Sequence, residues 1–199
     1  GDGSFSTNQN PTKSYINPGS YTVSLTTYKG TDSAVVSKID YINITDPPTV
    51  NYKIDTLIGC LPLVVNFTNL STAGGNPIKK WLWDFGNTNT STLQNPGAVY
   101  INPGNYIVSL TVSDGLTNSI SFDTVSVFDN PVVDFVADDS VGCANLSVNF
   151  TNLTTTGNGI ASSFWNFGDG NTSTLTNPSH SFVAGIYSVT LIVTDNSGC

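Results

Sequence analysis

The sequence repeats itself, and this property constrains the fold more than any other. Three segments share an Asn-Pro pair, an aromatic residue four or five positions on, and a glycine two residues before a tyrosine. The matching sets are Asn10-Pro11, Tyr15, Gly19 and Tyr21; Asn95-Pro96, Tyr100, Gly104 and Tyr106; and Asn177-Pro178, Phe182, Gly185 and Tyr187. The copies are spaced by about 82 to 85 residues, so we expect tandem copies of one small domain.

Two further motifs recur upstream and set the repeat boundaries. Gly59-Cys60 and a later Phe-Thr-Asn-Leu recur at Gly142-Cys143, and Trp83-Asp84-Phe85-Gly86 recurs as Trp165-Asn166-Phe167-Gly168. We expect residues 1–46 to be the C-terminal half of a repeat, residues 47–129 a complete repeat, and residues 130–199 a repeat that lacks its last strand. The short segments Asp46-Pro47-Pro48 and Asp129-Asn130-Pro131 are the linkers, and their prolines restrict them.

The complete copy has the pattern of short β-strands. Leu63, Val65 and Phe67 alternate with polar or exposed-type residues, and turn residues such as Asn102-Pro103-Gly104 and Asp114-Gly115 separate the runs. Val, Ile, Thr, Tyr and Phe are plentiful, whereas Glu, Met and Arg are absent, which favours strands over helices. About seven strands per copy predict an all-β chain of two-sheet sandwiches.

Two aromatic positions point to an immunoglobulin-like sandwich. Trp83 and Trp165 fall on the third predicted strand, where such folds bury a tryptophan between the sheets. Tyr21, Tyr106 and Tyr187 open the sixth strand in the pattern Gly-x-Tyr-x-Val, the position of a tyrosine corner whose hydroxyl bonds to the backbone. Valine stands two residues later in each copy, so the inter-sheet disulfide of antibody domains is absent.

At these residues the chain resembles the PKD domain family. The family motif is similar to Trp165-Asn166-Phe167-Gly168-Asp169-Gly170, followed by Asn177-Pro178, an aromatic residue, and Gly185-x-Tyr187-x-Val189-x-Leu191. The resemblance implies an extracellular β-sandwich that serves as a spacer, an adhesive module or a force-bearing module. Some members bind calcium between the second and third strands, but neither loop here carries a carboxylate, so we expect no such site.

The Gly-Cys pairs resemble those of giant gliding and adhesive surface proteins of Bacteroidota, which are exported by type IX secretion. That phylum O-glycosylates Asp-Ser/Thr-apolar triplets, and four triplets here make Ser33, Thr56, Thr124 and Ser140 candidate sites. Asn-x-Ser/Thr sequons, such as those at Asn43, Asn66 and Asn145, arise easily by chance in a chain so rich in Asn and Thr.

Several classes of function conflict with the residues present. A net charge of −8 opposes binding to nucleic acid or anionic membrane, and no apolar run is long enough for a membrane helix. His180 is the only histidine, and we expect it in a loop. The aspartates of the Trp motif are not repeated, because Asp84 becomes Asn166 and Asp169 becomes Asn87. We therefore expect no catalytic residues, cofactor or metal.

The three cysteines leave three alternatives. Cys60 and Cys143 precede the second strand at one pole of their copies, whereas Cys199 follows the sixth strand at the opposite pole. Because those poles lie roughly 25 Å apart in one sandwich, a Cys143–Cys199 bridge is disfavoured, although these cysteines are nearest in sequence. We expect a Cys60–Cys199 bridge between copies, with Cα atoms within about 7 Å; unpaired thiols are the third alternative.

Together these patterns predict a non-enzymatic structural or adhesive stalk at the cell surface, with neighbouring repeats of the same chain as partners. Surface polysaccharide and other cell-surface proteins are further candidate partners. The alternatives are a carbohydrate- or protein-binding accessory module of a secreted enzyme, and a component of a surface layer or sheath. A module that binds ligand directly requires exposed aromatic residues, for which Tyr28, Tyr41 and Tyr52 are the candidates.

Overall fold

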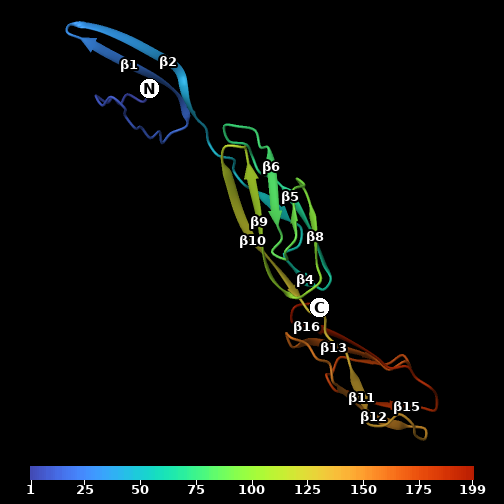
Figure 1. Ribbon diagram of the computed structural model, residues 1–199. Coiled ribbons are helices and arrows are strands. Elements are labelled where there is room, and N and C mark those ends of the chain that lie inside the picture. The colour runs from blue at the N-terminus through green and yellow to red at the C-terminus, as the bar shows by residue number, and fades with distance from the viewer. The chain divides into compact units, whose positions relative to one another are not determined.

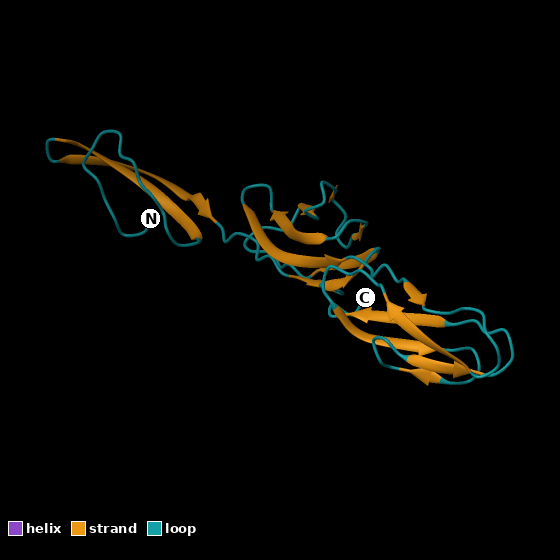
Figure 2. Cartoon of the chain, turned by 90° about the horizontal axis from the view of Figure 1, so that it is seen from below, coloured by secondary structure: helices purple, strands orange, loops and turns teal.

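The computed structural model describes all residues from 1 to 199 and contains sixteen strands and no helix (Figure 2). The chain therefore has no helix of the length and apolarity needed to cross a membrane. By the proximity of Cα atoms it divides into two compact units, which do not coincide with the sequence repeats. The first unit comprises Gly1–Tyr52, Asn69–Leu82 and Leu110–Ser121, and the second comprises Lys53–Thr68, Trp83–Ser109 and Phe122–Cys199.

The first partial repeat forms a two-stranded antiparallel sheet of β1 (Gly19–Lys29) and β2 (Asp32–Ile44) (Figure 1). Gly30 makes the connecting turn with a φ of 62°, a left-handed conformation that glycine adopts without steric penalty. The register shifts between Tyr21 and Val23, close to Asp40 on the paired strand, which has a φ of 49°. Many apolar side chains of this hairpin are exposed, including Leu25 and Val36 at 63% each.

The complete repeat is a sandwich of a three-stranded and a five-stranded sheet, in the orders β3-β5-β8 and β4-β10-β9-β6-β7. Its strands are β3 (Tyr52–Ile54), β4 (Ile58–Cys60), β5 (Leu63–Asn69), β6 (Lys80–Asp84), β7 (Thr90–Ser91), β8 (Gly97–Tyr100), β9 (Gly104–Ser113) and β10 (Asn118–Phe128). The first strand is broken into β3 and β4, which lie in different sheets, so eight segments stand where we expected seven.

The hydrogen bonds of Asp55 support this break in the first strand. Its carboxylate accepts the backbone N–H of Asn66 at 2.9 Å and the Asn66 side-chain amide at 2.8 Å. The third repeat has the same arrangement, with Asp138 bound to Asn149 at 2.8 and 2.6 Å. Because these bonds favour the charged form, they lower the pKa of both aspartates.

Side chains along the strands alternate between the buried core and the exposed surface, as the sequence predicts. Leu63, Val65 and Phe67 on β5 are buried, whereas Val64 is 58% exposed. Trp83 on β6 is fully buried and packs against Phe67, with ring centroids 5.1 Å apart. Val125 and Val127 on β10 are also buried, at 0% and 3% exposure. Burial of each of these apolar side chains stabilises the fold by about 1.5–3 kcal/mol.

The third repeat has two three-stranded sheets, in the orders β11-β12-β15 and β14-β13-β16. Its strands are β11 (Phe135–Ala137), β12 (Leu146–Asn152), β13 (Ile160–Asn166), β14 (Thr172–Ser173), β15 (Ser179–Phe182) and β16 (Thr190–Asp195). Trp165 lies fully buried in a core with Phe150, Phe167, Phe182 and other apolar residues. Tandem β-sandwich repeats, the predicted fold class, are thus confirmed.

The predicted tyrosine corner forms in two of the three copies. Tyr21 donates its hydroxyl to the Asn17 carbonyl at 2.6 Å, and Tyr106 donates to the Asn102 carbonyl at 2.8 Å. Gly19 and Gly104 precede these tyrosines with the same φ of 152°. Our expectation is wrong for Tyr187, whose hydroxyl makes no such bond and whose ring packs on Phe182 at 5.0 Å. Gly185 lacks the positive φ of its counterparts, so the turn has a different shape there.

This difference predicts unequal effects of one substitution. Tyr106→Phe removes the bond to the Asn102 carbonyl, and we expect it to destabilise the complete repeat by about 0.5–1.5 kcal/mol. Tyr187→Phe is the matched control and should change stability little, because no such bond is lost. Urea unfolding followed by tryptophan fluorescence measures both, and equal losses in the two variants would contradict the assignment.

Candidate functional site

A site built from two repeats surrounds Cys60 and Cys199. Cys60 ends β4, which runs parallel to the end of β10 and places Cys60 opposite Phe128. The Leu61 N–H donates to the Phe128 carbonyl at 3.1 Å, and the Asn130 side-chain amide donates to the Leu61 carbonyl at 2.7 Å. The linker that leaves the complete repeat is therefore bonded to the segment that carries Cys60.

The turn that carries Cys199 is organised by one buried carboxylate. Asp195 ends β16 and is 1% exposed. Its Oδ1 accepts the Ser197 N–H at 2.9 Å, the Ser197 hydroxyl at 2.6 Å and the Cys199 N–H at 3.0 Å. Its own N–H donates to the Cys199 carbonyl at 2.9 Å. These bonds close the turn and hold the Cys199 backbone in one position.

Cys60 and Cys199 form a disulfide with a Cα–Cα distance of 5.6 Å and a sequence separation of 139 residues. The distance lies within the limit of about 7 Å that the sequence prediction sets. This is the pairing that we expected from the poles of the sandwich. The structure contains neither a Cys143–Cys199 bridge nor unpaired thiols at Cys60 and Cys199. Cys143 is an exposed free thiol.

The Asp195 carboxylate gives this turn a pH dependence. Hydrogen bonds from Ser197, and then from the Cys199 and Ser197 backbone, lower the pKa of Asp195 from 3.8, although burial opposes the shift. Because the pKa of Asp195 is lower in the folded state, its ionised carboxylate stabilises the fold. This stabilisation is complete at pH values above 3.8 and is lost as the pH falls through the lower, folded-state pKa.

We therefore expect Asp195→Asn to destabilise the third repeat at pH 6, and the difference from the wild type to shrink as the pH falls toward 2. Urea unfolding at several pH values measures this difference. Asp129→Asn is the control, because the exposed Asp129 carboxylate accepts no hydrogen bond. A difference between the Asp195→Asn variant and the wild type that stays constant from pH 6 to pH 2 would contradict the role of the charge.

We expected His180 to lie in a loop, but it lies on strand β15. Its Nε2 lies 2.8 Å from Asp169 Oδ2, and its ring stacks on Phe167 with a centroid distance of 4.2 Å and an interplanar angle of 4°. The pKa of Asp169 falls to about 2, first because of the hydrogen bond with His180 and then because of the Asn171 N–H. The pair joins the Trp-motif turn to β15 in this repeat alone, because Lys13 and Ala98 replace the histidine elsewhere.

The positions proposed for glycosylation are dispersed. Ser33, Thr124 and Ser140 are exposed, whereas Thr56 is half-buried beside Asp55. Of the candidate aromatic residues for ligand binding, Tyr28 and Tyr41 are 77% and 57% exposed on the hairpin, and Tyr52 is half-buried. No group of three or more His, Cys, Asp or Glu residues is arranged to hold a metal ion.

Comparison with known proteins identifies the family. The PKD domain model matches residues 45–127 and again residues 129–199, which together make up more than half of the chain. The chain belongs to the PKD domain family. PKD domains are typically non-catalytic accessory modules, although they are also found in proteases.

Solved structures that are similar to the chain come from bacterial proteins. The PKD1 domain of Vibrio anguillarum Epp is 29% identical, covers 42% of this chain and 96% of its own length, and has a TM-score of 0.38. The PKD1 domain of the Vibrio cholerae metalloprotease PrtV is 31% identical, covers 43% of this chain and all of its own length, and has a TM-score of 0.38. A fibronectin(III)-like module of Clostridium thermocellum CbhA is 15% identical, covers 74% of this chain and 87% of its own length, and has a TM-score of 0.39. No curated protein matches the chain.

Asp114 and Asp195 were missed by the sequence interpretation of these PKD repeats. Asp114 is fully buried at the end of β9, and its Oδ1 accepts the N–H groups of Leu116 and Thr117 at 2.8 and 2.7 Å. It occupies the same place in its copy as Asp195, in the shared pattern Tyr-x-Val-x-Leu-x-Val-x-Asp. Recurrence of a carboxylate at the end of a buried strand was the signal that could have identified both residues.

Proposed function

We propose that the chain is a non-catalytic spacer segment of a surface protein, in which successive PKD repeats are joined covalently as well as by the linker. The observation that carries the proposal is the Cys60–Cys199 bond between two repeats. A linker alone leaves two repeats free to pivot, whereas a second covalent connection restricts rotation and limits how far the repeats separate. Disulfides persist in oxidising surroundings, which agrees with an extracellular spacer.

The finer proposal is that this spacer belongs to a long adhesive surface protein, such as the gliding adhesins that the Gly-Cys pattern resembles. Support comes from the tandem repeats, the acidic composition and the exposed Ser33, Thr124 and Ser140 triplets. O-glycans at these positions would add hydration and protease resistance to the surface. Mass spectrometry of the protein isolated from its native host tests this proposal, with added hexose masses expected on the Asp-Ser/Thr peptides.

An accessory module that binds carbohydrate is the second candidate function. The observation that favours it is the pair of exposed tyrosines on the hairpin, where Lys38 Nζ lies 4.3 Å from the ring centroid of Tyr41. Exposed aromatic rings provide stacking surfaces for sugars. The tyrosines of the other two repeats take part in the core or in turns, so this candidate rests on the hairpin alone.

The rotational freedom between the two repeats distinguishes the spacer from other modules. Dyes attached through unnatural amino acids at Thr88 and Thr174, both exposed, report the distance between the repeats by single-molecule energy transfer. We expect one narrow distribution for the oxidised chain and a broad one for Cys60→Ser. Equally broad distributions would contradict the spacer function. A glycan array run in parallel should show no binding, whereas binding that is lost in Tyr41→Ala would favour the carbohydrate-binding candidate.

A further inference from the structure

A loop of the complete repeat holds the linker that follows the first partial repeat. The Asn76 side-chain amide donates to the Thr45 hydroxyl at 2.8 Å. The Gly75 N–H donates to the Asp46 carbonyl at 3.0 Å. Thr45 comes directly after β2, so these bonds fix the chain at the point where it leaves the hairpin. All of these residues belong to the first compact unit.

Two glycines allow this loop to lie against the linker. A Cβ atom at Gly75 would lie 2.6 Å from the Thr45 Cβ atom, which is closer than two side-chain carbons approach. A Cβ atom at Gly74 would meet the carbonyl oxygens of Asp46 and Pro47 at still shorter range. Glycine is the residue that permits so close an approach between backbones. Close contact and hydrogen bonding therefore coincide on the same linker residues.

Asn76 also connects the linker to the interior of the complete repeat. Its amide nitrogen lies 3.5 Å from Asp114 Oδ2, and Asp114 is fully buried. Asp114 Oδ1 in turn accepts the N–H groups of Leu116 and Thr117 in the turn between β9 and β10. Because that turn fixes the carboxylate in place, the carboxylate orients the Asn76 amide toward Thr45.

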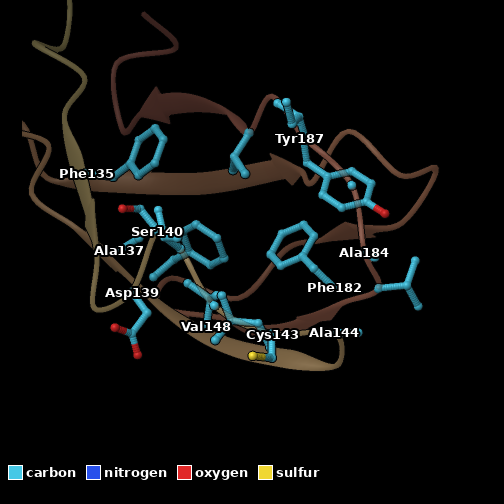
Figure 3. Close-up of a pocket in the computed structure, with 18 residues that line it drawn as sticks. Phe135, Ala137, Asp139, Ser140, Cys143, Ala144, Val148, Phe182, Ala184 and Tyr187 are labelled. Carbon is cyan, nitrogen blue, oxygen red and sulfur yellow. The ribbon is translucent and has the colours of Figure 1, made fainter.

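The corresponding loop of the third repeat, residues 156–159, makes no such contact with its own linker. A Cβ atom at Gly157 would meet no other part of the chain within 4 Å. Phe128 stands where the first linker has Thr45, and it has no hydroxyl to accept a hydrogen bond. The side-chain amide of Asn158 donates instead to the turn that follows β16. Other residues line the pocket of this repeat drawn in Figure 3, so its open space does not cause the difference.

We propose that residues 74–76 form a non-covalent clamp, which fixes the junction between the first and the complete repeat whatever the redox conditions. Its hydrogen bonds open under load and form again, whereas the Cys60–Cys199 bond opens only on reduction. The chain thus carries two kinds of joint, one reversible and one covalent. The inference rests on the proposed spacer function for its purpose, but the clamp uses no residue of the disulfide site, so each proposal can fail without the other.

Amide hydrogen exchange at Gly75, measured by NMR on the full oxidised chain, reports whether the clamp is closed. We expect this amide to be protected. Asn76→Ala should accelerate its exchange at least about tenfold, because the variant loses the bonds to Thr45 and Asp114. Asn158→Ala is the matched control and should leave the exchange of Gly75 unchanged. Reduction of the disulfide should leave it unchanged as well.

Residual dipolar couplings test whether the clamp orients the hairpin. In the wild type, the couplings of β1 and β2 should fit the same alignment tensor as those of residues 69–82 and 110–121. Gly74→Ala should require two tensors, because its methyl group displaces the linker, whereas Gly157→Ala should still fit one. Thr45→Val, which removes only the hydroxyl, is the milder variant and should change the couplings in the same direction as Gly74→Ala.

The proposal is overturned if Gly75 exchanges like an amide in an unfolded chain, or if Asn76→Ala and Asn158→Ala affect its exchange equally. It is also overturned if reduction alone accelerates this exchange as much as Asn76→Ala does, since the junction would then depend on the disulfide. Two tensors for the wild type would overturn it as well, because the contacts would not fix the junction.

Discussion

Stretched between its two ends, the oxidised chain should reach a contour length roughly 480 Å shorter than that of the reduced chain. The disulfide joins residues 139 positions apart, and force applied at the ends passes from Cys60 directly to Cys199. All the residues between them are then shielded, even after both repeats have unfolded. Each unfolded residue contributes about 3.3–3.6 Å of length, which gives the stated difference. Optical tweezers or atomic force microscopy with handles at both termini measure it.

The cysteine variants provide the controls for this measurement. Cys60→Ser should extend to the full length without reductant, whereas Cys143→Ser should behave as the wild type, because Cys143 is a free thiol. Identical contour lengths for the oxidised and the reduced wild type would mean that no bond spans the two repeats. The expected result would show the functional consequence of the bond, which is a limit on extension under load.

Trp165→Ala should destabilise the third repeat by about 3–5 kcal/mol. The indole is fully buried, lies 5.1 Å from the Phe135 ring and 5.4 Å from the Phe150 ring, and donates its Nε1–H to the Leu175 carbonyl at 3.0 Å. Truncation removes this contact area, leaves a cavity and deprives the carbonyl of its donor. Since small domains are stable by only about 5–15 kcal/mol, much of the stability of this repeat should be lost.

Phe164→Ala is the matched control for this substitution. Phe164 precedes Trp165 on β13, but its side chain points to the opposite face and is 42% exposed. We expect a loss below about 1 kcal/mol, typical of surface positions. Urea unfolding measured by circular dichroism compares the two variants. Losses of similar size would mean that the tryptophan is not the centre of the core.

The repeated positions explain why much of the fold could be predicted from the sequence. Alternation at Leu63, Val65 and Phe67 sets which face of β5 is buried, and Trp83 and Trp165 recur at one place on the third strand. The opposite poles of the sandwich favoured the Cys60–Cys199 bridge over Cys143–Cys199, because strand direction determines where each cysteine lies, but unpaired thiols remained an alternative until the structure showed the bond. These inferences rest on the two-residue periodicity of strands, which is a local property.

The features that could not be predicted depend on tertiary contacts. The switch of the first strand between sheets is accompanied by the Asp55–Asn66 hydrogen bonds, which join residues eleven positions apart. His180 has no counterpart in the other copies, so nothing repeated indicated that it would stack on Phe167. Tyr187 lacks its corner bond because the backbone at Gly185 does not adopt the positive φ of Gly19 and Gly104.

Peptide mapping under non-reducing conditions tests most directly whether one covalent bond joins the two PKD repeats. Cleavage before aspartate separates the three cysteines into the peptides Asp55–Trp83, Asp139–Gly168 and Asp195–Cys199. We expect mass spectrometry of the folded, air-oxidised protein to detect the first peptide linked to the third, and the second peptide with a free thiol. A linked pair of Asp139–Gly168 and Asp195–Cys199, or three free thiols, would contradict the joined-repeat structure.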